Sequence, residues 1–182
     1  MRGFALSLRL LGSREVVPGW KDSAPDTMAE PSGAHRGVVP PGDNERMLLH
    51  IDHVGIACRS LEATIERYVS VFGLTVAAQE VNTEQGVREA MLATASGSSY
   101  VQLLEPLADD TPVGKFLARR GEGMHHVGYA VADVTAALAE IGGTGVRLID
   151  SRPRHGSMGA SIAFLHPGDL GGVLTELVQP AR

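Results

Sequence analysis

Apolar and polar residues follow two different periods along residues 47–182, and these periods predict strands and helices in a regular order. Alternation with a period of two indicates strands over residues 48–57, 74–81, 88–95 and 99–104. Between the first two strands the apolar positions recur at helical spacing, which predicts a helix. Ser60 provides its N-cap and Gly73 ends it.

The second half of the chain repeats this order. A short helix, which begins at Thr111-Pro112 and ends at Gly121, separates the two halves. Asp133 caps the next predicted helix, and strands are expected at residues 125–131, 146–151, 161–165 and 173–178. Both halves have the order βαβββ. This predicts an α+β fold of two paired βαβββ modules, at about 47–106 and 123–180, that form an open, incomplete barrel.

The repeat is also visible in individual residues. The segment HVGIA at 53–57 matches HVGYA at 126–130, and QLLEP at 102–106 matches ELVQP at 176–180. Each module therefore carries a histidine on its first strand and an oxygen donor on its last strand. Two modules related by a pseudo-twofold axis would place these four side chains at equivalent points.

The four repeat-matched side chains are His53, Gln102, His126 and Glu176. Two imidazole nitrogens, an amide oxygen and a carboxylate suit a borderline divalent ion such as Co²⁺, Ni²⁺, Zn²⁺, Mn²⁺ or Fe²⁺. A lone histidine on a strand is more often a buried structural residue, but four donors at matching positions favour a metal site inside the barrel. Strand alternation also predicts that His125 faces away from this site.

Residues 1–46 differ from the rest of the chain. Proline, glycine and small polar residues are scattered there without a period, which predicts a disordered or mis-annotated N-terminal extension, with Met47 as the alternative start. The apolar, arginine-bearing first 14 residues leave a transit peptide open. We expect a cytoplasmic protein, with the mitochondrial matrix as the alternative. The single cysteine, Cys58, agrees with a reducing compartment.

Composition restricts the class of protein. The chain has 182 residues, 43% hydrophobic and 20% charged, which is typical of one globular domain. The formal net charge of −5 argues against a nucleic-acid partner. No stretch is long and apolar enough for a membrane helix, so we expect no membrane partner.

Five segments of the chain form a distinctive set: IDHVGIA at 51–57, EQGVREAM at 84–91, YVQLLEP at 100–106, GEGMHHV at 121–127 and LTELV at 174–178. Together they resemble the methylmalonyl-CoA epimerase family of the vicinal oxygen chelate (glyoxalase-like) superfamily. The resemblance covers residues 47 to about 180 and implies a vicinal oxygen chelate domain over 47–182. It also implies a homodimer.

The resemblance implies a role for each matched residue. His53, Gln102, His126 and Glu176 would hold the metal, with Co²⁺ expected first and Ni²⁺, Mn²⁺ or Zn²⁺ as alternatives. Glu89 and Glu176 would transfer protons at C2 of an acyl-CoA substrate, interconverting (2R)- and (2S)-methylmalonyl-CoA through an enolate. Four polar residues are expected to bind the substrate: Gln85, Lys115, Arg154 and Ser157.

Two alternatives remain at this point. Another metal enzyme of the superfamily, a glyoxalase I-like lyase or a dioxygenase, would use the same ligands. An extradiol dioxygenase commonly has four modules, and this chain has room for two. A non-catalytic small-molecule binding protein of the same fold would lack the complete ligand set, so bound metal distinguishes it from an enzyme.

Overall fold

The computed structural model describes residues 46–181, so the extension expected at residues 1–46 lies outside the described range except for Arg46. The described chain forms one eight-stranded mixed sheet with three α-helices and two short 3₁₀ helices. The elements are β1 (His50–Ala57), α1 (Leu61–Phe72), β2 (Thr75–Asn82), β3 (Val87–Ala93), β4 (Tyr100–Pro106), α2 (Pro112–Arg120), β5 (Gly123–Ala130), α3 (Val134–Gly142), β6 (Arg154–His155), η1 (Ser157–Gly159), β7 (Ser161–Leu165), η2 (Pro167–Asp169) and β8 (Leu174–Gln179).

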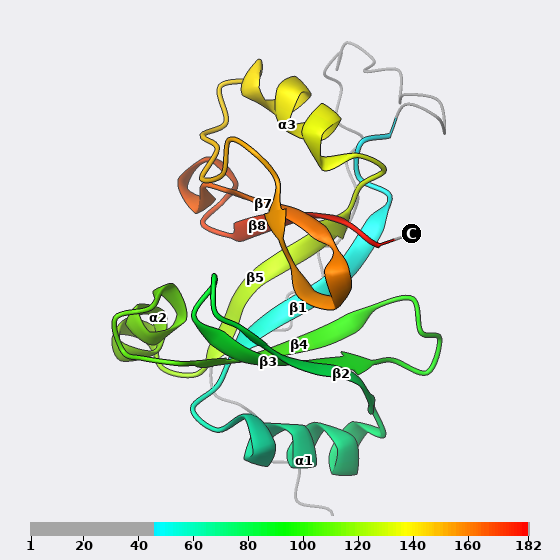
Figure 1. Cartoon of the computed structure of the whole chain (residues 1–182), viewed down its shortest axis with the longest axis vertical. Coiled ribbons are helices and arrows are strands. Elements are labelled where there is room, and N and C mark those ends of the chain that lie inside the picture. The colour runs from blue at the N-terminus through cyan, green and yellow to red at the C-terminus, as the bar shows by residue number, and fades with distance from the viewer. Residues whose placement is uncertain (1–45, 182) are drawn as a thin grey trace, which may run out of the picture. The chain divides into compact units, whose positions relative to one another are not determined.

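The sheet has the strand order β2-β3-β4-β1-β5-β8-β7-β6, which confirms the α+β arrangement of two paired modules. β1 pairs with β4, and β5 with β8, in parallel; the other strand pairs are antiparallel. Outward from the antiparallel β1–β5 pair, each side has the same succession of first, last, third and second strand of its module (Figure 1). A pseudo-twofold axis therefore lies between β1 and β5, where the two repeated histidine strands meet.

Helices α1 and α3 cover the outer face of the sheet, one in each module (Figure 1). Leu61 of α1 packs against Leu92 and Leu103, and α3 packs in the same way on β7 and β8. Burial of each such leucine contributes roughly 1.5–3 kcal/mol. Because side chains alternate across a strand, the neighbours of these apolar residues, Glu89 and Gln102 among them, point to the concave inner face.

Helix α2 closes one end of the concave face. Val113 and Leu117 pack there against inner-face residues of β1, β3 and β4: Ala57, Val87 and Leu104. Thr111 caps the helix by accepting a hydrogen bond from the Gly114 backbone N–H, as its position before Pro112 predicts. The inner face is therefore apolar at this end and polar further along.

The strand expected at residues 146–151 is wrong. Only an isolated bridge, between Leu148 and Leu165, forms there, and the second strand of this module is the two-residue β6. The backbone N–H groups of Ile149 and Asp150 both donate to the carbonyl of Phe164. Successive residues of the segment therefore do not pair with successive residues of β7, as a regular β-ladder requires. Apolar alternation is present in the sequence, but it does not fix regular pairing.

Among the described residues, no helix combines the length and the apolar character that a membrane span requires.

Candidate metal and active site

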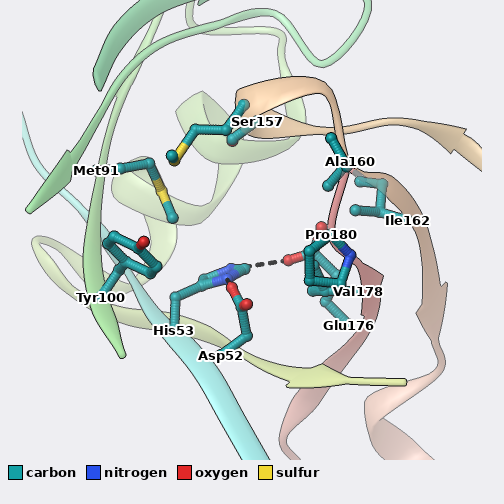
Figure 2. A pocket seen from close by; sticks show the side chains of 12 residues that line it. Asp52, His53, Met91, Tyr100, Ser157, Ala160, Ile162, Glu176, Val178 and Pro180 are labelled. Carbon is teal, nitrogen blue, oxygen red and sulfur yellow. Dashed lines mark hydrogen bonds and ion pairs between the residues drawn. The ribbon is translucent and has the colours of Figure 1, made fainter. Parts of the chain in front are cut away.

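The polar centre of the protein lies on the concave face of the sheet. Six polar or charged side chains are buried in the described chain, and five of them come together here: His53, Glu89, Gln102, His126 and Glu176. A cavity of about 150 Å³ is lined by two of them, His53 and Glu176; Figure 2 shows its other walls, which include Met91, Tyr100 and Ile162. The cavity is smaller than the roughly 300–1,000 Å³ of sites that hold a drug-sized ligand, so it suits a small chemical group.

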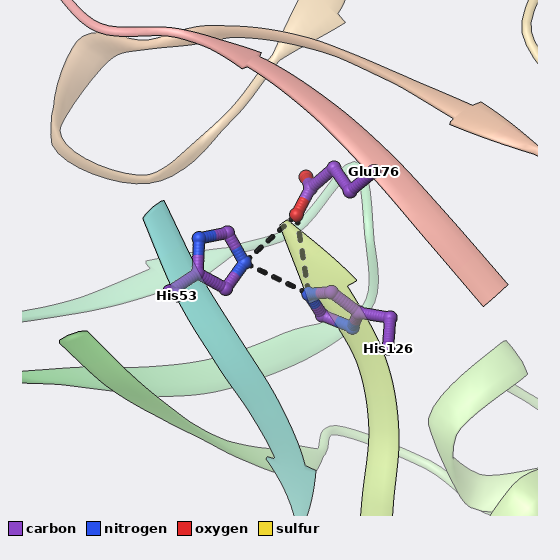
Figure 3. A group of neighbouring side chains, drawn as sticks. All are labelled: His53, His126 and Glu176. Carbon is purple, nitrogen blue, oxygen red and sulfur yellow. Dashed lines mark hydrogen bonds and ion pairs between the residues drawn. The ribbon is translucent and has the colours of Figure 1, made fainter. Parts of the chain in front are cut away.

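Three side chains from three strands converge on one point (Figure 3). The Nε2 atoms of His53 and His126 are 2.9 Å apart, and the Glu176 carboxylate oxygen Oε2 lies 2.9 Å from the first and 3.1 Å from the second. Adjacent ligands of an octahedral ion with bonds of about 2.1 Å are about 3.0 Å apart, whereas tetrahedral ligands are about 3.4 Å apart. The cluster therefore fits a divalent ion with octahedral geometry.

A glycine of the opposite module makes room for each histidine ring. Gly55 pairs with His126 across β1 and β5, and Gly128 pairs with His53. A Cβ atom added at Gly55 would lie 2.2 Å from the His126 ring, and one at Gly128 would lie 2.4 Å from the His53 ring. The position two residues after each histidine in the repeat must therefore be glycine, because a larger residue would overlap the histidine ring of the other module.

Electrostatics at the cluster favour a positive charge. Burial alone would raise the pKa of Glu176, but hydrogen bonds and charge from His126 and His53 outweigh it and lower the pKa to about 2. Burial alone would lower the pKa of His53, but Asp52 and Glu176 outweigh it and raise the pKa to about 9. Metal ligands must be deprotonated, so a carboxylate with a lowered pKa suits a ligand to a cation.

Gln102 and Glu89 extend the cluster along β4 and β3. The Gln102 Nε2 group donates to Glu89 Oε2 at 2.6 Å and to Ser157 Oγ at 2.8 Å. The Gln102 Oε1 atom is buried and has no hydrogen-bond partner in the described chain, which leaves it available as a ligand. Burial, supported by the charges of Glu80 and Glu176, raises the pKa of Glu89.

The expected substrate-binding residues lie in three different places. Ser157 lines the cavity at the cluster, on the short η1 turn. Gln85 and Arg154 line a second cavity of about 200 Å³ beside α2, where the Arg154 side chain pairs with Asp150 at 3.0 Å. Lys115 is exposed on α2 and lines neither cavity.

Two residues next to the ligands were not found as site residues by sequence reasoning. Asp52 Oδ1 lies 2.8 Å from His53 Nδ1, and His125 Nδ1 lies 3.0 Å from His126 Nδ1. The expectation that His125 faces away is wrong, because the β1–β5 register shifts there. Strand alternation does not signal such a shift, although both residues directly precede a repeated histidine.

A curved sheet of two βαβββ modules, with a buried His-His-Glu cluster where the modules meet, defines a protein of the vicinal oxygen chelate type whose cluster could hold a metal ion. Comparison with known proteins agrees with this class. The model of the Glyoxalase/Bleomycin resistance protein/Dioxygenase superfamily matches residues 52–164. The chain belongs to this superfamily.

Several relatives have a known activity. A structure of methylmalonyl-CoA epimerase in complex with methylmalonyl-CoA and NH4+ is 55% identical, with a TM-score of 0.70, and the match covers 74% of this chain and 96% of that one. A variant of the Streptomyces coelicolor epimerase in complex with 2-nitronate-propionyl-CoA is 54% identical, with a TM-score of 0.71, over 74% of this chain and 99% of that one. The mitochondrial methylmalonyl-CoA epimerase of Homo sapiens is 33% identical over 130 residues, 71% of this chain and 73% of the human protein.

Proposed function

We propose that this protein is a methylmalonyl-CoA epimerase, which interconverts (2R)- and (2S)-methylmalonyl-CoA by proton transfer at C2. The observation that carries the proposal is the pair of buried carboxylates in one concavity. Glu89 comes from the first module and Glu176 from the second. Glu176 lies against both histidines, and Glu89 accepts a hydrogen bond from Gln102 and interacts electrostatically with Glu176. Two acid/base groups from different strands suit a reaction that must exchange a proton on both sides of one carbon.

We assign the metal site to His53, Gln102, His126 and Glu176. The cluster geometry, the acidic Glu176 and the unpaired Gln102 Oε1 support four ligands, which leave two positions of an octahedron for substrate. A divalent ion held there would supply a Lewis acid for the negative charge that develops on the thioester oxygen. Co²⁺ is the ion to test first, followed by Ni²⁺, Mn²⁺ and Zn²⁺.

The chain's own groups account for the proton transfers. Glu89 is fully buried, its pKa is raised, and it is not one of the four ligands, so it can accept the C2 proton and return it. Glu176 would serve the other face of C2 while it also holds the metal. The Gln102 amide donates hydrogen bonds to Glu89 and to Ser157, and the first of these bonds would keep the Glu89 carboxylate oriented.

The cavity beside the cluster accommodates the acyl end of the substrate. Its volume leaves the CoA nucleotide outside. Ser157, which lines this cavity, would contact the acyl group, and Gln85 and Arg154, which line the second cavity, would contact more distant polar groups of the substrate. Lys115 is exposed on α2 and would contact the CoA phosphates at the surface.

The proposal is tested in deuterated water. Purified full-length protein with Co²⁺ should exchange the C2 hydrogen of methylmalonyl-CoA and convert each epimer into the other. Metal-free protein should do neither until Co²⁺ is restored. If the loaded protein leaves methylmalonyl-CoA unchanged but isomerises a glutathione hemithioacetal or cleaves a catechol, the activity belongs to another enzyme of the superfamily.

We also propose that the protein is a homodimer that pairs through the outer face of β1 and β5. An apolar stripe covers this face, formed by three cross-strand pairs: Ile51 with Tyr129, Val54 with Val127, and Ile56 with Met124. Ile51 is 48% exposed and Met124 58% exposed in the single chain. Sedimentation at micromolar concentration should give twice the chain mass, and Val127→Glu should give a monomer. A wild-type mass of one chain would contradict the dimer.

For residues 1–46 we propose an extension that is dispensable for folding and turnover. A protein that starts at Met47 should match the full chain in melting temperature and rate.

We propose the cytoplasm as the compartment of the protein, with the mitochondrial matrix as the alternative, because the single thiol of Cys58 is free and buried. Import of the full chain, but not the Met47 form, into isolated mitochondria would favour the matrix.

A further inference from the structure

We propose that Asp52 and His125 are positioning residues of the metal site, and that a pair of symmetric β-bulges turns them toward the ligand histidines. Each is the residue directly before a histidine of the cluster, and the two positions are equivalent in the repeat. The inference rests on the proposed metal site. It assigns the hydrogen-bond acceptors that hold the two imidazoles in the form that binds metal.

The strand register shows the bulges. Along β1 and β5, Ile51 pairs with Tyr129 and His53 with Gly128, so Asp52 is an extra residue in β1. Further along the same pair, Gly55 pairs with His126 and Ile56 with Met124, so His125 is an extra residue in β5. A bulge bends the strand and redirects the side chain of the extra residue. Two bulges related by the pseudo-twofold axis thus redirect the neighbour of each ligand.

Asp52 accepts from His53. Its Oδ1 lies 2.8 Å from His53 Nδ1, and Figure 2 shows the carboxylate beside the ring. A carboxylate can only accept, so the hydrogen of the neutral His53 ring must reside on Nδ1. The lone pair is then on Nε2, the atom 2.9 Å from Glu176. Asp52 thereby selects the tautomer that presents an electron pair to the cluster.

His125 takes the same position toward His126, with an imidazole in place of the carboxylate. The two Nδ1 atoms are 3.0 Å apart, so one must donate and the other accept. His126 needs its lone pair on Nε2, at the cluster, and therefore donates from Nδ1 to His125. The His125 ring packs edge-on against Phe116 of α2, with centroids 5.0 Å apart, which fixes its orientation.

Partners of this kind are worth about 10- to 100-fold in metal affinity. We therefore expect Asp52→Ala and His125→Phe each to bind Co²⁺ about 10- to 100-fold more weakly than the wild type. Asp52→Asn and His125→Gln keep a hydrogen-bond acceptor, in the form of an amide oxygen, and should recover most of the affinity. His125→Phe also keeps an aromatic ring against Phe116, which separates the loss of an acceptor from the loss of packing.

The experiment is a titration of the metal-free full chain with Co²⁺, followed by calorimetry and by visible absorption of the bound ion, without substrate. His50→Phe, an exposed histidine on β1, and Asp109→Ala serve as controls that should match the wild type. The melting temperature of each metal-free variant reports on folding.

Weaker binding and an altered Co²⁺ spectrum in the two acceptor-free variants, with recovery in the two acceptor variants, supports the inference. Unchanged affinity in Asp52→Ala and His125→Phe would overturn it, as would equal losses in both members of each pair. Because no substrate is used, tight Co²⁺ binding without epimerisation would refute the proposed function and leave the positioning roles standing.

Discussion

The two modules of the sheet are alike where they hold the histidines and unlike where they present carboxylates. In both, a bulge residue precedes the histidine, and a glycine two positions later accommodates the ring of the other module. Beside these matched positions, Gln102 of β4 corresponds to Glu176 of β8. Glu89 of β3 corresponds to apolar Ile162 of β7. Glu89 pairs with Leu104, two residues after Gln102, and Ile162 pairs with Val178, two residues after Glu176.

The comparison separates two requirements of the site. The symmetric residues form a frame that brings two nitrogens to one point, and symmetric construction achieves this with a single local pattern used twice. The asymmetric residues give the two modules different chemistry: the first has a buried carboxyl that is hydrogen-bonded to Gln102, and the second has a carboxylate at the histidine cluster. The predictions below test these two groups of residues in turn.

The largest effect is expected from loss of the symmetric histidines. His53→Ala and His126→Ala should each lose bound metal, and to a similar degree, because the two Nε2 atoms occupy equivalent corners of the cluster. Elemental analysis after dialysis measures this directly. Full occupancy in both variants would remove the cluster as the metal site, and a strong loss in only one would show that the modules do not contribute equally.

The next effect concerns the two carboxylates. Glu89→Gln keeps the shape of the side chain but cannot accept a proton, so epimerisation should fall roughly 10²- to 10⁴-fold while metal remains bound. Exchange of deuterium should persist in one of the two epimers. Glu176→Gln should lose metal, and exchange should fall for both epimers. Deuterium incorporation into each epimer, measured beside metal content, distinguishes the two roles.

Ile162→Val provides the matched control at the position that corresponds to Glu89, and it should retain metal and turnover. Near-normal epimerisation by Glu89→Gln would exclude Glu89 from the reaction.

The glycines should show an intermediate effect. Gly55→Ala and Gly128→Ala would push the opposite histidine ring aside, and a displacement of about 1 Å can cost about 10²-fold in rate. Co²⁺ affinity and turnover should fall together in both variants. Gly142→Ala is the control, because a Cβ atom there meets nothing closer than Leu148 at 3.9 Å. Unchanged metal binding in Gly128→Ala would show that the ring can relocate freely.

The smallest effect is expected at the helix caps, which are also equivalent in the repeat. Ser60 accepts from Ala63 N at 3.3 Å, and Asp133 accepts from Ala136 N at 2.9 Å. Ser60→Ala and Asp133→Ala should each lower the free energy of unfolding by about 1 kcal/mol. The loss should be larger for Asp133, whose charge also interacts with the helix dipole. Urea denaturation measures the change, and Co²⁺ affinity should not move.

Much of the frame could be predicted from sequence, because local patterns determine it. Ser60 and Asp133 mark helix starts, and the HVG repeat identifies His53 and His126, which the structure brings together. The roles of Gln102 and Glu89 stay predictions, although both side chains lie beside the cluster. The alternation of side chains along a strand predicts that both side chains face the inside of the sheet, and this alternation is visible in the sequence.

The neighbours of the ligands could not be predicted in the same way. A bulge depends on the register between β1 and β5, which are 73 residues apart at the two histidines, and a period of two places Asp52 and His125 on the wrong face. The requirement for Gly55 arises from a ring of the other module. Similarly, the failed strand at residues 146–151 depends on how β7 accepts its hydrogen bonds.

The covalent connection between the modules has a consequence for how such a site can diversify. A twofold assembly of identical single modules presents every residue twice. It could offer two glutamines or two glutamates at the positions of Gln102 and Glu176, but not one of each, and any acid at position 89 would have a twin. The segment between β4 and β5, which carries α2, joins two copies that are free to diverge. Duplication supplies the geometry, and a tandem chain allows an unsymmetrical pair of acids within it, which an assembly of identical modules does not.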